Sequence, residues 1–148
     1  MSHRIEKIKL NKEALKKHIP LPKCEVKEGK IWYPPDLFLD QIHDIMIEQY
    51  GGYPGYELGL EPYHHILQQV RETEGIYHKG ALLLKELITT RIFQDGHHRT
   101  GLVIVKTFLD MNDAVFKEKD EQKVIRFIKN IRRYTIEEIE GWLKHGEL

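Results

Sequence analysis

The sequence contains one cysteine, no long apolar run and no excess of charge of either sign. Cys24 alone excludes an internal disulfide and a multi-cysteine zinc site. No apolar stretch approaches the ~20 residues of a membrane-spanning helix, and the N-terminus carries no signal-peptide core. Lys and Arg together number 23, as do Asp and Glu, so the net charge is zero with neutral histidines. From these absences we expect a cytoplasmic protein that binds neither nucleic acid nor a membrane.

The first 30 residues differ from the rest in charge, with nine Lys or Arg against four Glu. We predict a basic N-terminal appendage over residues 1–33, followed by a helical domain over residues 34–148. Within the appendage, the sequence predicts a short helix over residues 12–18 and a small β-hairpin over residues 24–33. The appendage is either a solvated edge element or a docking surface for an acidic partner.

Helical periodicity dominates from residue 34 onward and predicts an all-α bundle with a small β-hairpin near the N-terminus. Helices are predicted over residues 36–50, 62–70, 73–90, 98–111, 118–131 and 136–144. Asp36 is a candidate cap for the first of them, and Thr135 with Glu138 forms a capping box for the last. The helix over 98–111 is apolar nearly all round, as expected of a buried central helix.

The segment most informative about chemistry reads Arg91-Ile-Phe-Gln-Asp-Gly-His-His-Arg-Thr-Gly101. Asp95-Gly96 allows a sharp turn, after which the free N–H groups of the helix start attract anions. Arg99 in the first turn opposes the helix dipole, yet its guanidinium fork suits phosphate oxygens. We therefore predict an anion site over Gly96–Thr100. The alternative is that Asp95 caps the helix and pairs with Arg99.

Phe93–Gly101 resembles the signature His-x-Phe-x-Asp/Glu-Gly-Asn-x-Arg of the Fic/Doc family, the death-on-curing or Fic-domain proteins. Upstream, Ile42-His43 and Gly51-Gly52-x-x-Gly55, followed by Gly59-Leu60, resemble elements typical of the Doc branch. The resemblance covers about residues 34–115. It implies a Fic-type helical bundle.

The resemblance also implies an activity: a toxin-like enzyme that transfers AMP or phosphate from a nucleotide to a protein hydroxyl. The implied cofactor is Mg²⁺ with ATP or another nucleotide, and Asp95 would hold the Mg²⁺. The implied partners are a nucleotide, a protein target and an antitoxin-like protein. The candidate phosphate- and nucleotide-binding residues are Arg91, Gly96, His97, Arg99 and Thr100.

Two positions depart from the family pattern. Arg91 stands where the family has its catalytic histidine, and His97 stands where it has an asparagine. Arginine stays protonated in proteins, so it cannot accept a proton from the attacking hydroxyl. Loss of a general base typically costs about 10²–10⁴ in rate. His97 and His98 are candidate replacement bases, since a neutral imidazole suits that role. The alternatives are an impaired nucleotidyl- or phosphotransferase and a non-catalytic nucleotide- or protein-binding module.

A metal-dependent phosphohydrolase is a weaker alternative, suggested by the number of histidines. The candidate ligands would be His43-Asp44, His64-His65, Asp95 and His97-His98. Adjacent histidines on one helix diverge by about 100°, so each pair offers one ligand at most. No His-x-x-x-His or Glu-x-x-His spacing provides a chelating face. We expect His64, His65 and His78 to be surface or packing groups.

Overall fold

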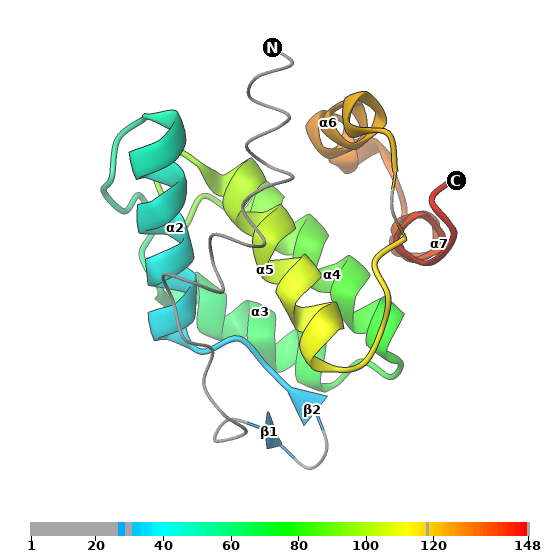
Figure 1. The fold of residues 1–148 in the computed structure, drawn as a ribbon. Helices are drawn as coiled ribbons and strands as arrows, with labels where there is room; N and C mark the ends of the chain where they lie inside the picture. The colour runs from blue at the N-terminus through cyan, green and yellow to red at the C-terminus, as the bar shows by residue number, and fades with distance from the viewer. Residues whose placement is uncertain (1–26, 29–30, 118, 148) are drawn as a thin grey trace.

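The computed structural model describes residues 27–28, 31–117 and 119–147. These residues form six α-helices, one short 3₁₀ helix and a two-stranded hairpin, which confirms the predicted all-α fold (Figure 1). In the hairpin, β1 (Lys27–Glu28) pairs antiparallel with β2 (Ile31–Trp32). The short helix predicted over residues 12–18 lies outside the described residues.

The helices follow the predicted order, with differences at their ends. They are α2 (Asp36–Tyr50), α3 (Glu61–Arg71), α4 (Ile76–Thr89), α5 (His97–Met111), α6 (Glu121–Lys129), the 3₁₀ helix η1 (Ile131–Arg133) and α7 (Ile136–His145). The helix predicted over 73–90 begins only at Ile76, because Gly75 before it has a positive φ of 89°. The helix predicted over 118–131 ends at Lys129 and continues as η1.

Two capping predictions had opposite outcomes. The capping box of α7 is confirmed, with the Thr135 hydroxyl and the Glu138 carboxylate each accepting the other residue's backbone N–H. The prediction that Asp36 caps α2 is wrong, because Asp36 is the first helical residue and Pro35 holds the cap position without a side-chain bond. The Asp36 carboxylate instead accepts a hydrogen bond from His64 Nε2 at 2.5 Å.

Helix α5 is the central element, as its apolar sequence predicts. It crosses the middle of the bundle between α2 and α4, and α4 also packs against α3 and α7 (Figure 1). Gly80 permits this close packing, since a Cβ there would lie 3.3 Å from Leu109 Cδ2 and 3.5 Å from Leu143 Cδ1. Among the described helices, none is long and apolar enough to span a membrane.

The hairpin is attached to the bundle through Trp32. Its indole is fully buried and lies edge-to-face against Phe38, with ring centroids 5.8 Å apart. The Asn112 side chain accepts from Trp32 N at 2.8 Å and donates to Trp32 O at 3.0 Å. Among the described residues, Trp32 is the first that is buried in the core.

Candidate functional site

The candidate site lies where the loop Arg91–Gly96 enters α5. Gly96 has φ 82° and ψ 7°, the left-handed conformation, and no side chain caps the helix after it. A Cβ at Gly96 would lie 3.3 Å from Ile47 Cδ1 and 3.5 Å from the His43 ring, so the turn requires glycine. The first N–H groups of α5 have no intrahelical acceptor, and the positive end of the helix dipole lies here. This geometry suits the binding of an anion.

Asp95 secures the loop to two other segments. Its carboxylate Oδ2 accepts the backbone N–H of Tyr53 at 2.9 Å, and its backbone oxygen accepts from His43 Nε2 at 2.7 Å. The alternative in which Asp95 caps α5 is therefore wrong, because its carboxylate is turned to Tyr53 and the cap residue is Gly96.

The rings of His43, Phe93 and Tyr56 form a stack that anchors the loop. Phe93 is buried and lies parallel to the His43 ring, with centroids 3.6 Å apart. Tyr56 also stacks on Phe93, with centroids 5.3 Å apart, and its hydroxyl donates to the Asp40 carboxylate of α2. The hydrogen bond to Asp40, with partial burial, raises the pKa of Tyr56 to about 12. The loop is thereby fixed to α2.

Backbone hydrogen bonds join the loop to the segment between α2 and α3. Glu57 N donates to Ile92 O at 2.9 Å, and Gln94 N donates to Gly55 O at 3.0 Å. Tyr56 and Phe93 form an isolated antiparallel bridge between these bonds. Two segments nearly 40 residues apart in sequence therefore form one unit beside the start of α5.

Arg91 lies at the beginning of this loop and is ion-paired. Its Nε donates to Glu57 Oε2 at 2.6 Å, and Nη2 donates to Gln94 O at 3.2 Å. Both side chains of the pair are exposed, so the bridge contributes little to stability. The guanidinium nevertheless places a fixed positive charge near His97, where it contributes to the lowered pKa of that residue.

His97 and His98 begin α5 and lie against each other, with ring centroids 4.7 Å apart. Burial, followed by the charge of Arg91, lowers the pKa of His97 below its ordinary value of 6.5. Burial and the neighbouring His97 and Arg99 lower the pKa of His98 to about 4. Both imidazoles are therefore neutral near pH 7, and both are weaker bases than an ordinary histidine, His98 in particular.

Two buried polar atoms in the first turn of α5 have no hydrogen-bond partner among the described residues. They are Nδ1 of His97 and Oγ1 of Thr100, whose residue is only 2% exposed. Buried polar groups are almost always paired, because an unpaired group loses its hydration without compensation. Both atoms are enclosed, so a ligand at the helix start reaches them only if neighbouring side chains move.

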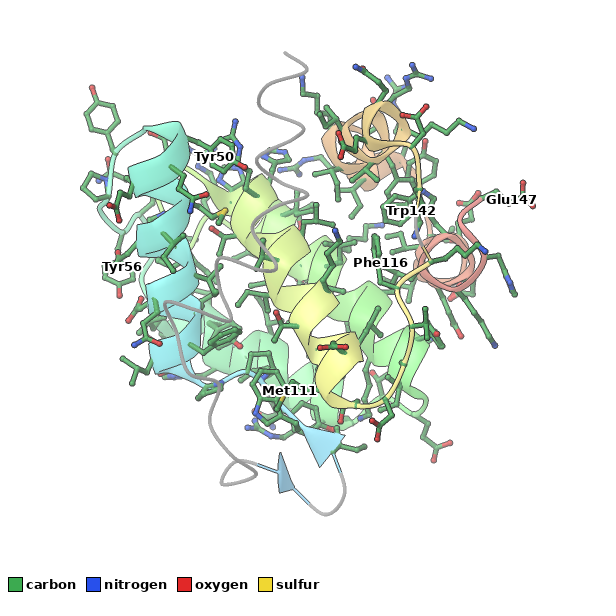
Figure 2. All side chains as sticks on the ribbon, in the orientation of Figure 1. Tyr50, Tyr56, Met111, Phe116, Trp142 and Glu147 are labelled. Atoms are coloured by element: carbon green, nitrogen blue, oxygen red, sulfur yellow. The ribbon has the colours of Figure 1, made fainter. Side chains whose placement is uncertain are left out.

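Arg99 is held in the same turn by an aromatic ring. Its guanidinium carbon lies 4.3 Å from the centroid of Tyr50, the last residue of α2. Figure 2 shows Tyr50 at the end of α2, level with the start of α5. The stack limits the positions of the guanidinium and holds it against the end of α2.

The described residues assemble no group of three or more His, Cys, Asp or Glu side chains that could hold a metal ion. The ligand set expected for a metal-dependent phosphohydrolase is thus missing from this part of the chain. Asp95 could supply only one carboxylate to Mg²⁺, and one oxygen of that carboxylate already accepts from Tyr53 N. Mg²⁺ is often bound by one or two carboxylates together with substrate phosphates, so a nucleotide would have to supply the other ligands.

An open groove of about 370 Å³ lies on the neighbouring surface of α3 and α4. It is lined by Leu58, Glu61, Pro62, His65, Ile66, Gln69, Glu86 and Thr90. The carboxylates of Glu61 and Glu86 have the same sign as a phosphate and would repel it. We therefore do not include the groove in the anion site.

The structure brings the predicted site residues together around one helix start, namely Arg91, Asp95, Gly96, His97, His98, Arg99 and Thr100. His43 of α2 also lies here, bonded to the Asp95 carbonyl and stacked on Phe93, whereas His64 and His78 are held elsewhere. His64 pairs with Asp36, and His78 donates to Glu140 at 2.8 Å. The sequence did not reveal the supporting residues Tyr53 and Glu57, although the nearby glycines marked their segment.

Comparison with models of known protein families gives no match, and comparison with curated proteins finds no significant relative. Functional inference therefore depends on the geometry around α5 and on the resemblance carried by its motif.

Proposed function

We propose that this chain is a Fic/Doc-like protein that binds the phosphates of ATP or another nucleotide at the start of α5. The observation that carries the proposal is the uncapped helix start after left-handed Gly96, with Arg99 held over Tyr50 in its first turn. The N–H donors and the dipole of the helix start, and the guanidinium fork of Arg99 in the same turn, each favour a phosphate group.

The binding roles follow from this placement. The N–H groups of Gly96 to Arg99 and the Arg99 guanidinium would donate to phosphate oxygens. The Asp95 carboxylate would hold Mg²⁺, which neutralises phosphate charge when bound. Nδ1 of His97 and Oγ1 of Thr100 would provide further polar contacts from the same turn.

The proposed reaction is transfer of AMP or phosphate to a protein hydroxyl. The hydroxyl oxygen attacks phosphorus, the bond to the leaving pyrophosphate or ADP breaks, and the hydroxyl proton must pass to a base. Arg91 cannot take that proton, and it is paired with Glu57 instead. We expect transfer to be impaired, with neutral His97 or His98 as the replacement base.

In the proposed setting the protein is a cytoplasmic member of a toxin–antitoxin pair, with a protein target and an antitoxin-like partner. The second candidate function is a non-catalytic nucleotide- or protein-binding module. The ion pair of Arg91 with Glu57 favours it, because a cation stands where the reaction needs a proton acceptor.

The test combines binding with labelling. Thermal-shift titration with nucleotides, with and without Mg²⁺, reports binding, and ATP labelled on the α- or γ-phosphate reports which group is transferred to protein in a cell extract. Binding with weak labelling is the expected result. Binding without any labelling would favour the module, and the absence of both would contradict the proposal.

A further inference from the structure

The surface of α6 and η1 carries a face of exposed basic side chains. Its members are Lys123, Arg126, Lys129, Arg132 and Arg133, which we call the α6–η1 basic face. No Asp or Glu occurs between Glu121 and Glu137, so the face is uninterrupted along the chain. Among the residues that the structure describes, none forms an ion pair with these five cations. Figure 1 shows α6 at the edge of the bundle.

The opposite side of α6 fixes this face in place. Val124, Phe127 and Ile128 are buried in the core. Phe127 stacks on Trp142 with ring centroids 3.8 Å apart and on Tyr134 at 4.6 Å. Because these rings hold α6 and η1 in one orientation, the cations are presented together without a rearrangement of the helix.

The spacing of the cations is slightly shorter than that of alternate side chains on an extended peptide, and the long Lys and Arg side chains can span the difference. Arg126 and Lys129 are three residues apart and occupy neighbouring turns, where Cβ atoms lie about 5–6 Å apart. Alternate side chains of an extended peptide are separated by about 6.5–7 Å, because each residue rises 3.2–3.4 Å. A short extended segment rich in Asp or Glu could therefore pair with successive cations.

Acidic residues at both ends limit the length of the basic face. Asp120 and Glu121 precede it, while Glu137 and Glu138 follow it in the first turn of α7. A nucleic acid carries uniform negative charge along its length and would meet these carboxylates at each end. The exposed aromatic side chains among the described residues are Tyr53 and Tyr56, which lie between α2 and α3, so α6 and η1 offer no exposed ring for base stacking.

We propose that the α6–η1 basic face is a docking surface for a short acidic segment of a partner protein. Charge complementarity with a segment of limited length carries this assignment. The face adjoins the proposed nucleotide site, since the charges of Lys129 and Arg132 contribute to the lowered pKa of His98. Binding depends on exposed charges, so its affinity falls as salt is added.

The test uses a fluorescein-labelled decaglutamate peptide and measures its anisotropy on titration with the full chain. The variant Arg126→Glu/Arg133→Glu reverses two cations of the face and leaves the residues at the start of α5 unchanged. We expect its affinity to be at least about tenfold weaker, since two attractions become repulsions. Binding by the native chain should weaken from about 0.05 M to about 0.5 M NaCl.

The matched control is Arg71→Glu/Lys144→Glu, which changes the net charge equally. Arg71 and Lys144 lie over the rings of Tyr33 and Tyr77, and they belong to α3 and α7 rather than to α6 or η1. This control should retain native affinity. Thermal unfolding shows whether each variant is folded. If Arg126→Glu/Arg133→Glu does not fold, Arg126→Gln/Arg133→Gln takes its place.

Three results would overturn the proposal. They are the absence of decaglutamate binding to the native chain, an equal loss in the control variant, and tighter binding of an oligouridylate of equal charge. The last would identify nucleic acid as the ligand. Because none of these measurements involves a nucleotide, the outcome is distinguishable from a failure of the proposed function.

Discussion

At residue 91, a guanidinium occupies the place where the Fic/Doc resemblance predicts a proton-accepting imidazole. The structure gives this arginine a local role, since it bonds both Glu57 and the carbonyl of Gln94. Its charge also contributes to the lowered pKa of His97 at the start of α5. In the proposed function, this side chain adds a cation near the phosphate site and withholds the base that transfer requires.

Restoring the base should restore transfer. Arg91→His together with His97→Asn should raise transfer to protein by about one to four orders of magnitude, because it supplies the missing proton acceptor. The measurement is incorporation of label from α- and γ-labelled ATP, and Arg99→Ala in the same background is the control that should abolish it. Native labelling as strong as that of the double variant would contradict the expected impairment, and its loss in His97→Ala or His98→Ala would show which replacement base is sufficient.

The sequence was informative about site residues whose role is local. Gly96 could be predicted because Asp-Gly before a helix forms a sharp turn, and the structure shows that turn. The partner of Arg91 could not be predicted, since Glu57 is 34 residues away and no pattern links them. The same holds for Asp95, whose carboxylate bonds a backbone group 42 residues distant rather than its own helix.

At the scale of elements, periodicity predicted the helices and their order, and deviations arose at their ends. The α7 capping box was predictable because both partners lie within four residues of each other. Asp36 gave a similar local signal, but its carboxylate bonds His64 from α3 and does not cap α2. Burial of a charged residue was a second feature that local sequence could not predict: Lys79 is buried, and nothing near it in sequence indicates this.

Lys79 should be important for the packing of α3 against α4. It is 4% exposed, and its Nζ donates to the carbonyls of Val70 and Arg71 at 2.9 and 3.2 Å. Lys79→Met keeps most of the bulk but leaves these carbonyls without a charged donor, so the free energy of unfolding should fall by ~1.5–3 kcal/mol. Urea unfolding measures this loss.

The matched control for that measurement is Lys144→Met. Lys144 is exposed, and its removal should change stability by less than about 0.5 kcal/mol. Equal losses in the two variants would show that burial of the Lys79 ammonium contributes nothing specific.

At the scale of the whole molecule, a net charge of zero conceals local charge. The total excluded a general polyanion binder, but it could not reveal five cations on α6 and η1 flanked by carboxylates. Their exposure depends on which face of α6 is buried, and that is decided by tertiary packing of Phe127 against Trp142. Composition alone contains no such information.

Stability of the whole chain should depend on the two histidines at the start of α5. The pKa of His98 is about 4 in the folded state against an ordinary 6.5, and that of His97 is also lowered. Between pH 4 and pH 6.5 the unfolded chain binds more protons than the folded chain. The free energy of unfolding is therefore retained above pH 6.5 and falls as the pH drops toward 4. His98→Gln should flatten this part of the stability–pH curve, measured by urea unfolding from pH 4 to pH 7. Parallel curves for the two chains would contradict the assignment.

The most direct test of the nucleotide site is calorimetric titration of ATP with Mg²⁺ into the native chain and the Arg99→Ala variant. Arg71→Ala, which removes an exposed arginine elsewhere, is the control. The account predicts measurable binding by the native and control chains. In Arg99→Ala, binding should weaken by ~1.5–3 kcal/mol, or about 10- to 150-fold, because charged hydrogen bonds to phosphate are lost. Native affinity in Arg99→Ala, or no binding by the native chain, would contradict it.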